Sequence, residues 1–170
     1  MKRGICAAAA LCCLLTAAGC TAKPAGENPA SEAVSFAALP GVDLASLLTA
    51  EEISAGLGCR TDELTAPLCY DDGASVRYAD SAYTVTLDLH VQRPSAELRR
   101  YMQESCAGLE TAPNLGDAAY FDRENAVLTV FYGEFVLTVT VDAEASADER
   151  RGVARHFAAL IGERLVQTAA

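Results

Sequence analysis

Asp88 and His90 are the residues of this chain whose types and spacing come closest to a chemical site. They stand two positions apart in the segment Tyr83–Val91, and residues two apart on an extended strand project from the same face. A carboxylate beside an imidazole can act as an acid–base pair or hold a metal ion. The sequence places no serine or cysteine nucleophile next to them, and strand surfaces often carry such residues, so the pair alone predicts no reaction.

The strand that carries this pair predicts a wider polar surface. Tyr83–Val91 reads YTVTLDLHV, so its threonines and its Asp–His pair face one side while its valines and leucines face the other. The segment Phe135–Val141 repeats this alternation. Together the two segments give a candidate binding surface of Thr84, Thr86, Asp88, His90, Thr138 and Thr140. The competing interpretation is that an antiparallel sheet simply has one wet face.

Two further groups could bind ions. The run Asp71–Gly73 lacks the alternating oxygen ligands and the distal glutamate of a calcium loop, which favours a turn between strands. Arg150, Arg151 and Arg155 could bind an anion, although a solvated helix face that pairs with nearby glutamates is the simpler interpretation. No Cys-x-x-Cys spacing occurs, and the sequence has only 2 histidines. The sequence therefore predicts no metal ligands and no cofactor.

Capping residues predict where the helices that hold these strands begin and end. The Thr49–Glu52 pair forms a capping box, and Gly58 is a C-terminal glycine, which together give a first helix. A second helix is expected over about Ser95–Gly108, where apolar residues recur every three or four positions. A third helix begins at the Ser146–Glu149 pair, which forms another capping box.

Strands fill the intervals between these helices. Val127–Tyr132 and Phe135–Val141 flank the hairpin turn Gly133-Glu134. Shorter strands are expected over Leu68–Tyr70, Ser75–Tyr78 and Ala118–Phe121. Leu68–Val91 aligns without gaps to Ala118–Val141, either as an internal repeat or by chance between two amphipathic meanders. The elements predict an α+β fold, an antiparallel β-sheet packed on one face by about three helices, in tandem helix-plus-meander units if the repeat is real.

The overall composition limits the function classes. The 170 residues carry 13 basic against 23 acidic side chains, a formal charge of −10, and 51% of them are hydrophobic. That apolar content excludes a disordered chain, and a polytopic membrane protein is excluded because only the N-terminus has a long apolar run. The acidic balance supplies no basic stripe for phosphates, so nucleic acid is excluded as a partner.

The N-terminus predicts export and lipid attachment. Lys2 and Arg3 precede the apolar run Ile5–Leu15, which is too short to span a bilayer. The segment then ends LTAAGC, and this ending resembles the lipobox of bacterial lipoproteins, although Ala17 stands where leucine is usual. The resemblance implies cleavage just before Cys20 and a diacylglycerol on its thiol. An ordinary secretory signal, with the cysteine incidental, is the alternative.

Three parts follow along the chain: a lipoprotein signal peptide (1–19), the lipidated cysteine with a flexible tether (20–35), and a single α+β domain (36–168). The tether has almost no large apolar residue, so burial cannot offset the entropy of ordering it. Removal of Lys2 and Arg3 leaves 11 basic against 23 acidic residues, a formal charge of −12. Anionic lipid repels such a surface, so the acyl chains would hold the protein to the extracytoplasmic face of the cell membrane.

Three of the 7 cysteines belong to the domain, namely Cys59, Cys69 and Cys106. An extracytoplasmic location permits a disulfide. We favour the pair Cys59–Cys69 because these residues flank a polar loop, whereas Cys106 lies on the apolar face of the second helix, where a free thiol is common. The alternative is that all three thiols are reduced.

Several short motifs also resemble small lipoproteins of high-GC Gram-positive bacteria, many of them of unknown function. The shared pattern is Leu57-Gly58-Cys59 at a helix end, Cys69-Tyr70 on a strand, and Gly116-Asp117-Ala118-Ala119-Tyr120 before a hairpin and a closing helix. The resemblance spans about Leu47–Leu165. It implies an extracytoplasmic α+β domain and no particular activity.

These observations order three functions. The first is a membrane-anchored binding or sensor module of the cell envelope, and the second is a structural or inhibitory domain that binds another protein. A hydrolase comes third, because the sequence contains no catalytic motif and we do not expect an enzyme. The partner, a small molecule or a protein, is not identified by the residues.

Overall fold

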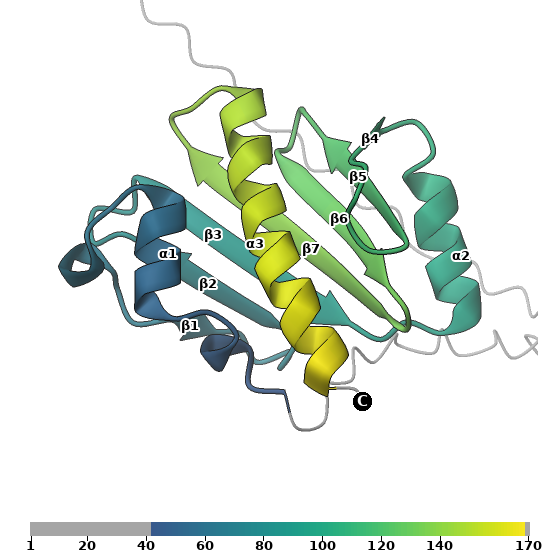
Figure 1. Cartoon of the computed structure of the whole chain (residues 1–170), viewed down its shortest axis with the longest axis horizontal. Coiled ribbons are helices and arrows are strands. Elements are labelled where there is room, and N and C mark those ends of the chain that lie inside the picture. Colours follow the sequence, from purple (N-terminus) through teal and green to yellow (C-terminus); the bar gives the residue numbers. More distant parts are fainter. Residues whose placement is uncertain (1–41, 169–170) are drawn as a thin grey trace, which may run out of the picture. The chain divides into compact units, whose positions relative to one another are not determined.

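The computed structural model describes residues 42–168 of the chain. The predicted signal peptide, the lipidation site Cys20 and the tether lie outside these residues. The described part contains one antiparallel β-sheet of seven strands, three α-helices and two short 3-10 helices (Figure 1).

The helices begin and end where local capping groups satisfy their free backbone groups. They are η1 (Leu44–Ser46), α1 (Ala50–Leu57), η2 (Thr61–Glu63), α2 (Ala96–Ser105) and α3 (Ala147–Thr168). The predicted capping box of α1 is present: the Thr49 hydroxyl accepts from the Glu52 amide, and the Glu52 carboxylate accepts from the Thr49 amide. Gly58 ends α1 with φ of 73°, a conformation that glycine adopts without strain. α2 ends at Ser105, earlier than the predicted Gly108, and α3 begins with the predicted pairing of Ser146 and Glu149.

The strands form a sheet in the order β1-β2-β3-β7-β6-β5-β4, and every pair is antiparallel. Their bounds are β1 (Leu68–Cys69), β2 (Ser75–Ala79), β3 (Val85–Gln92), β4 (Glu110–Thr111), β5 (Ala118–Asp122), β6 (Val127–Tyr132) and β7 (Phe135–Ala143). All of these strands except the two-residue β4 were expected from the sequence. The α+β fold class is therefore confirmed.

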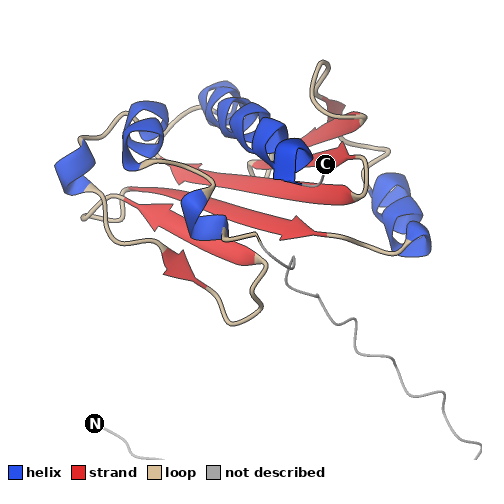
Figure 2. Cartoon of the chain, turned by 60° about the horizontal axis from the view of Figure 1, so that its bottom comes forward, coloured by secondary structure: helices blue, strands red, loops and turns tan. Residues whose placement is uncertain are grey.

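The hydrophobic core lies between one face of the sheet and the helices α1 and α3. Strand residues such as Leu87, Leu89 and Val139 are fully buried there, together with Phe157 and Ile161 of α3. Figure 2 shows α1 and α3 on one side of the strands. Burial of these apolar surfaces is the main force that holds the helices on the sheet. The alternate strand residues face the other side, and this second side is the open face of the sheet.

Helix α2 lies beside the sheet rather than over the core (Figure 1). Among the described residues, no α2 side chain belongs to the buried core cluster. Arg99 attaches the helix to the sheet because its guanidinium lies 5.1 Å from the centre of the Phe131 ring and donates to the Phe135 carbonyl. The helix links the two halves of the sheet along the chain, since it follows β3 and precedes β4, and its Arg99 contacts lie in the second half.

Those two halves repeat one design. β1–β2–β3 and β5–β6–β7 are antiparallel meanders that pair through their last strands, β3 and β7. Their first turns match in detail: Asp72 accepts from the amides two and three residues on, and Asp122 does the same. The ungapped alignment of the sequence pairs these same two aspartates. The shared topology and turn support the internal repeat.

The predicted disulfide between Cys59 and Cys69 is wrong in this structure. Both thiols are free, as is that of Cys106. Cys59 is held at the end of α1, where its amide donates to the Ser54 carbonyl, and Cys69 is exposed on β1, where it pairs with Val76. The intervening loop is pinned separately, since the Thr65 amide donates to the Ala79 carbonyl. The sequence showed the loop that separates the cysteines but not these anchors.

No helix among residues 42–168 is both long enough and apolar enough to cross a membrane. α3 is the longest at 22 residues, but charged side chains recur along it.

Candidate functional site

The open face of the sheet carries a pocket of about 240 Å³. Its lining comes from the β1–β2 turn and from β2, β3 and β7, and consists of Tyr70, Asp72, Ser75, Asp88, Leu89, His90, Thr138 and Thr140. Four of the six residues of the predicted binding surface are among them. We call this site the open-face pocket.

The register of the central strands creates the pocket. His90 lies opposite Ser75 on one side and opposite Thr138 on the other. Two residues earlier on β3, Asp88 lies between its neighbours in the same way, opposite Arg77 on β2 and Thr140 on β7. Directly opposite residues in an antiparallel pair have their Cβ atoms about 5 Å apart, so each row forms a continuous polar strip.

A turn of the chain holds a carboxylate over this strip. Both oxygens of Asp72 are engaged, Oδ1 by the amides of Ala74 and Ser75 at 2.9 Å each, and Oδ2 by the Ser75 hydroxyl at 2.6 Å. Burial alone would raise the pKa of Asp72, but these hydrogen bonds lower it below its ordinary value. At neutral pH the carboxylate is therefore ionised, and its hydrogen bonds hold it in place. These bonds form the turn that the sequence favoured for Asp71–Gly73 over a calcium loop.

The Ser75 hydroxyl connects Asp72 to His90. Its oxygen lies 2.8 Å from Nδ1 of His90. An ionised carboxylate can only accept, so the single hydroxyl proton of Ser75 points to Asp72, and Nδ1 of His90 must donate to the Ser75 oxygen. Burial lowers the pKa of His90, while the Asp72 charge acts in the opposite direction. The three side chains thus fix both the imidazole orientation and the position of its Nδ1 proton.

Asp88 forms an ion pair with Arg77, a neighbour that the sequence analysis did not single out. Arg77 donates to both oxygens of Asp88, from Nε at 2.6 Å and from Nη2 at 2.8 Å. These hydrogen bonds raise the pKa of the Arg77 guanidinium, which also lies 6.0 Å from the centre of the Tyr70 ring. The pair gives one wall of the pocket a fixed shape, because the fork of the guanidinium matches the carboxylate.

Two residues of the predicted surface fall outside the pocket. Thr84 precedes β3, and its hydroxyl donates to Asp80 in the β2–β3 turn at 2.7 Å. Thr86 lies on the open face, opposite Ala79 and Asp142, beyond the lining of the pocket. The predicted surface extended too far at Thr84 because the strand begins only at Val85, and at Thr86 because the pocket does not reach that end of the strand.

Sequence reasoning missed Ser75, Arg77 and Tyr70. Alternation within Ser75–Ala79 places Ser75 and Arg77 on one face, so their side of the sheet was readable. Their pairing with His90 and Asp88 depends on the register of β2 against β3, which the β2–β3 turn fixes. Residues that meet through strand register can be identified only when the positions of both strands are known.

Comparison with the second half of the sheet separates the residues that form the turn from the residue that is particular to the pocket. Asn125 takes the place of Ser75 in the equivalent turn, where its side-chain amide donates to Asp122 at 2.7 Å. The alignment puts Thr140 where the first half has His90. The turn itself is therefore a folding device in both halves, and the imidazole beside it distinguishes the first half.

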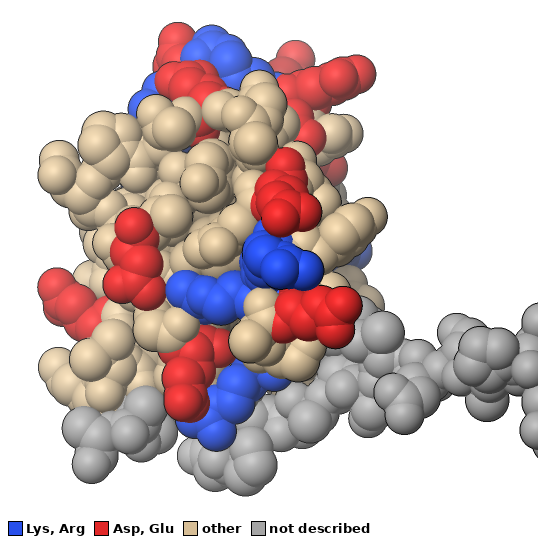
Figure 3. Space-filling model, turned by 90° about the vertical axis from the view of Figure 1, so that its right-hand side faces the viewer, with Lys and Arg blue, Asp and Glu red and all other residues tan. Residues whose placement is uncertain are grey.

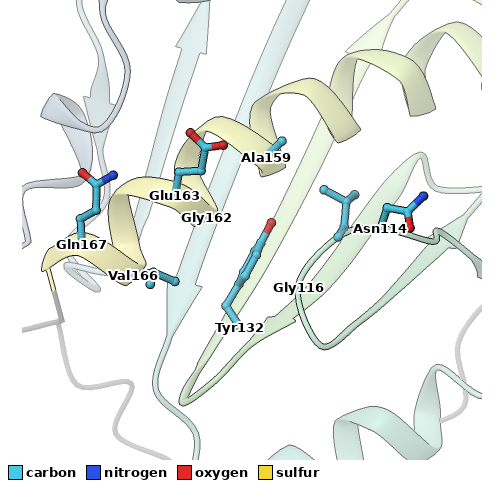
Figure 4. A pocket seen from close by; sticks show the side chains of 9 residues that line it. Asn114, Gly116, Tyr132, Ala159, Gly162, Glu163, Val166 and Gln167 are labelled. Atoms are coloured by element: carbon cyan, nitrogen blue, oxygen red, sulfur yellow. The ribbon is translucent and has the colours of Figure 1, made fainter. Parts of the chain in front are cut away.

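A larger cavity of about 450 Å³ lies on the other side of the sheet, between α3 and the loop before β5 (Figure 4). Tyr132 crosses it from β6, and its hydroxyl donates to the Ala158 carbonyl at 2.8 Å. A Cβ atom on Gly162 would lie 2.3 Å from the Tyr132 ring, so this glycine admits the ring against α3. The polar side chains around the cavity, Asn114 and Glu163 among them, stand apart from one another (Figure 4). We place the candidate site on the open face, where the polar groups are connected.

Charged side chains elsewhere are mixed. Figure 3 shows Lys and Arg lying among Asp and Glu on the face it presents. Ion pairs in the described part of the chain include Arg123–Asp148 at 2.9 Å and Arg93–Glu134 at 2.7 Å. Within residues 42–168 no group of three or more histidine, cysteine or acidic side chains is arranged to hold a metal ion.

Comparison of the chain with protein-family models, with curated proteins and with solved structures found no match in any of the three.

Proposed function

We propose that this protein is a lipid-anchored binding module of the cell envelope, and that its ligand site is the open-face pocket. The observation that carries the proposal is the Asp72–Ser75–His90 connection, which fixes an imidazole opposite Thr138 in a concave part of the open face. Polar groups held in fixed positions in a concavity are the usual features of a ligand site.

The size and lining of the pocket indicate the class of ligand. Its volume of about 240 Å³ is below the range of roughly 300–1,000 Å³ that holds drug-sized molecules. Threonine hydroxyls, a paired carboxylate and an imidazole offer both donors and acceptors, and Tyr70 at the rim is 39% exposed. A small polar molecule with several hydrogen-bonding groups and one apolar side fits this lining.

The lipid anchor is supported by the N-terminal residues. The basic start, the short apolar run and the LTAAGC ending are the motifs from which attachment at Cys20 was predicted. Two acyl chains on one cysteine hold a protein stably at a bilayer, where a single chain would not. The domain would then be displayed on the extracytoplasmic face of the membrane.

A binding role agrees better with the pocket than hydrolysis does. A serine nucleophile must give its proton to a base, usually histidine. Here the Ser75 proton points to Asp72 and the imidazole donates to Ser75, which is the reverse direction. The hydrolase alternative therefore lacks its central hydrogen bond in this arrangement.

Native mass spectrometry of the full chain, purified in mild detergent from the membranes of its own cells, tests the ligand site. We expect a stoichiometric small molecule that is retained by the wild-type chain and lost from the Thr138→Val variant. Thr86→Val is the matched control, because Thr86 lies on the same face outside the pocket. Equal retention by both variants, or a chain that carries no small molecule, would contradict the proposed site.

A protein partner is the second candidate function, and one observation favours it. Leu68 on the edge strand β1 is 55% exposed and lies next to the half-exposed Tyr70 in the same segment. Exposed apolar groups on a sheet edge are typical of strands that pair with another chain. In the same mass measurement, a stoichiometric protein that is lost from Leu68→Lys but kept in Thr138→Val would support this alternative.

Labelling with radioactive palmitate tests the anchor separately. We expect the label on the wild-type chain and on Cys13→Ser, whose cysteine lies in the predicted signal, and no label on Cys20→Ser. Unchanged labelling of Cys20→Ser, or no label on the wild-type chain, would remove the anchor from the proposal without affecting the pocket.

A further inference from the structure

A separate cavity of about 390 Å³ lies on the helix side of the sheet, between the end of α1 and the start of α3. Its apolar lining comes from Val85, Val141 and Ala143 of the central strands and from Leu57 and Val153 of the helices. Figure 1 shows these two helix ends side by side over β3 and β7. The volume falls within the range of roughly 300–1,000 Å³ that holds small molecules. We call it the α1–α3 cavity.

One arginine lines this apolar cavity without a partner. Nε of Arg150 is buried and has no hydrogen-bond partner among the described residues. The side chain is half-buried at the start of α3, and within the described part of the chain its guanidinium makes no ion pair. A buried donor without an acceptor loses its hydrogen bonds to water and gains none in return, and this loss is larger when the group is charged. The Arg150 guanidinium would therefore be stabilised by an acceptor from outside the described part of the chain.

Arg150 differs in this respect from every other arginine among the described residues. Each of the others contacts a carboxylate or a backbone carbonyl, as in the pairs Arg77–Asp88 and Arg151–Glu110 and in the bond from Arg155 to the Pro113 carbonyl. The chain has an excess of acidic residues, 23 against 13 basic ones, so partners are plentiful. The lack of one at Arg150 is a local property of the cavity.

The two glutamates that also line the cavity do not supply the missing acceptor. The Glu149 carboxylate accepts from the amide and the hydroxyl of Ser146, at 2.8 Å and 2.7 Å, as part of the cap of α3. Glu144 is exposed at the rim. Neither forms an ion pair with Arg150 among the described contacts, so the guanidinium and the apolar lining face the same space together.

We propose that the α1–α3 cavity binds a free monocarboxylate with a short apolar tail. The carboxylate would accept from the guanidinium of Arg150, whose fork favours bidentate geometry. The tail would lie along Val85, Val141 and Val153 and bury apolar surface. This site is independent of the open-face pocket, from which the sheet separates it.

Binding of octanoate tests the proposal. Octanol, which has the apolar tail but no carboxylate, and acetate, which has the carboxylate but no long tail, are the two controls. The full chain carrying Cys20→Ser is used in aqueous buffer, so that no acyl chain on that residue competes. We expect octanoate to shift the NMR methyl signals of Val85, Val141 and Val153, and octanol and acetate to bind at least tenfold more weakly. Absence of octanoate binding, or equal binding of octanol, would overturn the proposal.

Variants then separate the charge from the cavity. Arg150→Met keeps the bulk and removes the fork, and we expect octanoate binding to weaken about 10- to 100-fold. Arg100→Met is the matched control, because Arg100 is exposed on α2 and pairs only weakly with Glu104 at 3.8 Å. Ala143→Leu fills the cavity and should abolish binding while thermal unfolding shows that the variant is folded. If Arg150→Met binds as the wild type does, or if octanoate binds only after Glu144→Gln, the assignment is wrong.

Discussion

The oxygen of the Ser75 hydroxyl lies 2.8 Å from Nδ1 of His90, although the two residues are fifteen positions apart in the sequence. The register of β2 against β3 brings them together, and Asp72 from the preceding turn completes the connection. An imidazole that donates through a hydroxyl to a carboxylate is held in one orientation and keeps its Nδ1 proton. This relationship distinguishes the open-face pocket from an ordinary wet sheet face, and it leads to a measurable shift.

Asp72→Asn should lower the pKa of His90. Burial already holds that pKa below its ordinary value of 6.5, and the Asp72 charge partly offsets the effect by favouring the imidazolium. Loss of the charge removes the offset. The pKa is measured from the NMR shifts of the His90 ring against pH. Asp71→Asn is the control, since Asp71 is an exposed neighbour in the same turn; an unchanged or raised His90 pKa in Asp72→Asn would contradict the geometry.

Glu52→Gln should destabilise the fold above about pH 4.5 and have less effect near pH 2. The hydrogen bond from Arg164 of α3 is the largest cause that lowers the pKa of Glu52, from 4.5 to about 2, and the bond from the Thr49 amide adds to it. Because the folded-state pKa is depressed, the stabilisation is fully present above the unfolded value and is lost as pH falls through the folded one.

Chemical denaturation across this pH range measures the effect. Loss of the ion pair with Arg164 should cost about 1–2 kcal/mol of the free energy of unfolding at neutral pH, whereas the glutamine oxygen can still accept from the Thr49 amide and keep the capping box. Glu51→Gln is the control, because Glu51 is the exposed neighbour in the same helical turn. Curves for Glu52→Gln and wild type that stay parallel from pH 7 to pH 2 would show that the pair does not titrate as described.

The sequence predicted the parts of this fold that depend on nearby residues. The Thr49–Glu52 capping box, the turn at Asp72 and the Gly133-Glu134 hairpin each involve groups within a few positions of one another, and all three are present. What it missed depends on contacts between distant segments. Ser75 meets His90 only through strand register, and the unpaired state of Arg150 follows from the packing of α1 and α3 over the sheet.

The cysteines illustrate the same limit. Cys59 and Cys69 stand close in sequence, which favoured a disulfide, but separate anchors at the end of α1 and on β1 leave both thiols free. Sequence spacing shows that a loop could be closed, whereas the geometry of two anchored backbones decides whether it is.

A thiol-reactive probe should therefore modify Cys69 first. Cys69 is exposed, whereas burial raises the pKa of both the Cys59 and the Cys106 thiols and so reduces the fraction of reactive thiolate. Labelling of the folded chain with iodoacetamide, followed by peptide mapping, gives the order. Fastest labelling of Cys106, or an intact mass before reduction that matches a disulfide within the domain, would contradict the free-thiol arrangement.

The glycines of α3 provide the most direct test of packing on the helix side. A Cβ on Gly162 would lie 2.3 Å from Cζ of Tyr132, so Gly162→Ala forces the ring or the helix to move and should cost about 1–3 kcal/mol of unfolding free energy. Gly152→Ala is the matched change in the same helix, because nothing lies within 4 Å of a Cβ there. It should stabilise the protein by about 0.5–1 kcal/mol through helix propensity.

The opposite signs of these two changes separate packing from propensity. Both replace glycine by alanine inside α3, so any effect of composition or expression is shared, and thermal or urea unfolding reads the difference. A Tyr132→Ala background should relieve the cost of Gly162→Ala, because the ring that the new Cβ would strike is absent. Equal stabilisation by both substitutions in the wild-type background would show that Tyr132 does not pack against Gly162 as Figure 4 shows it.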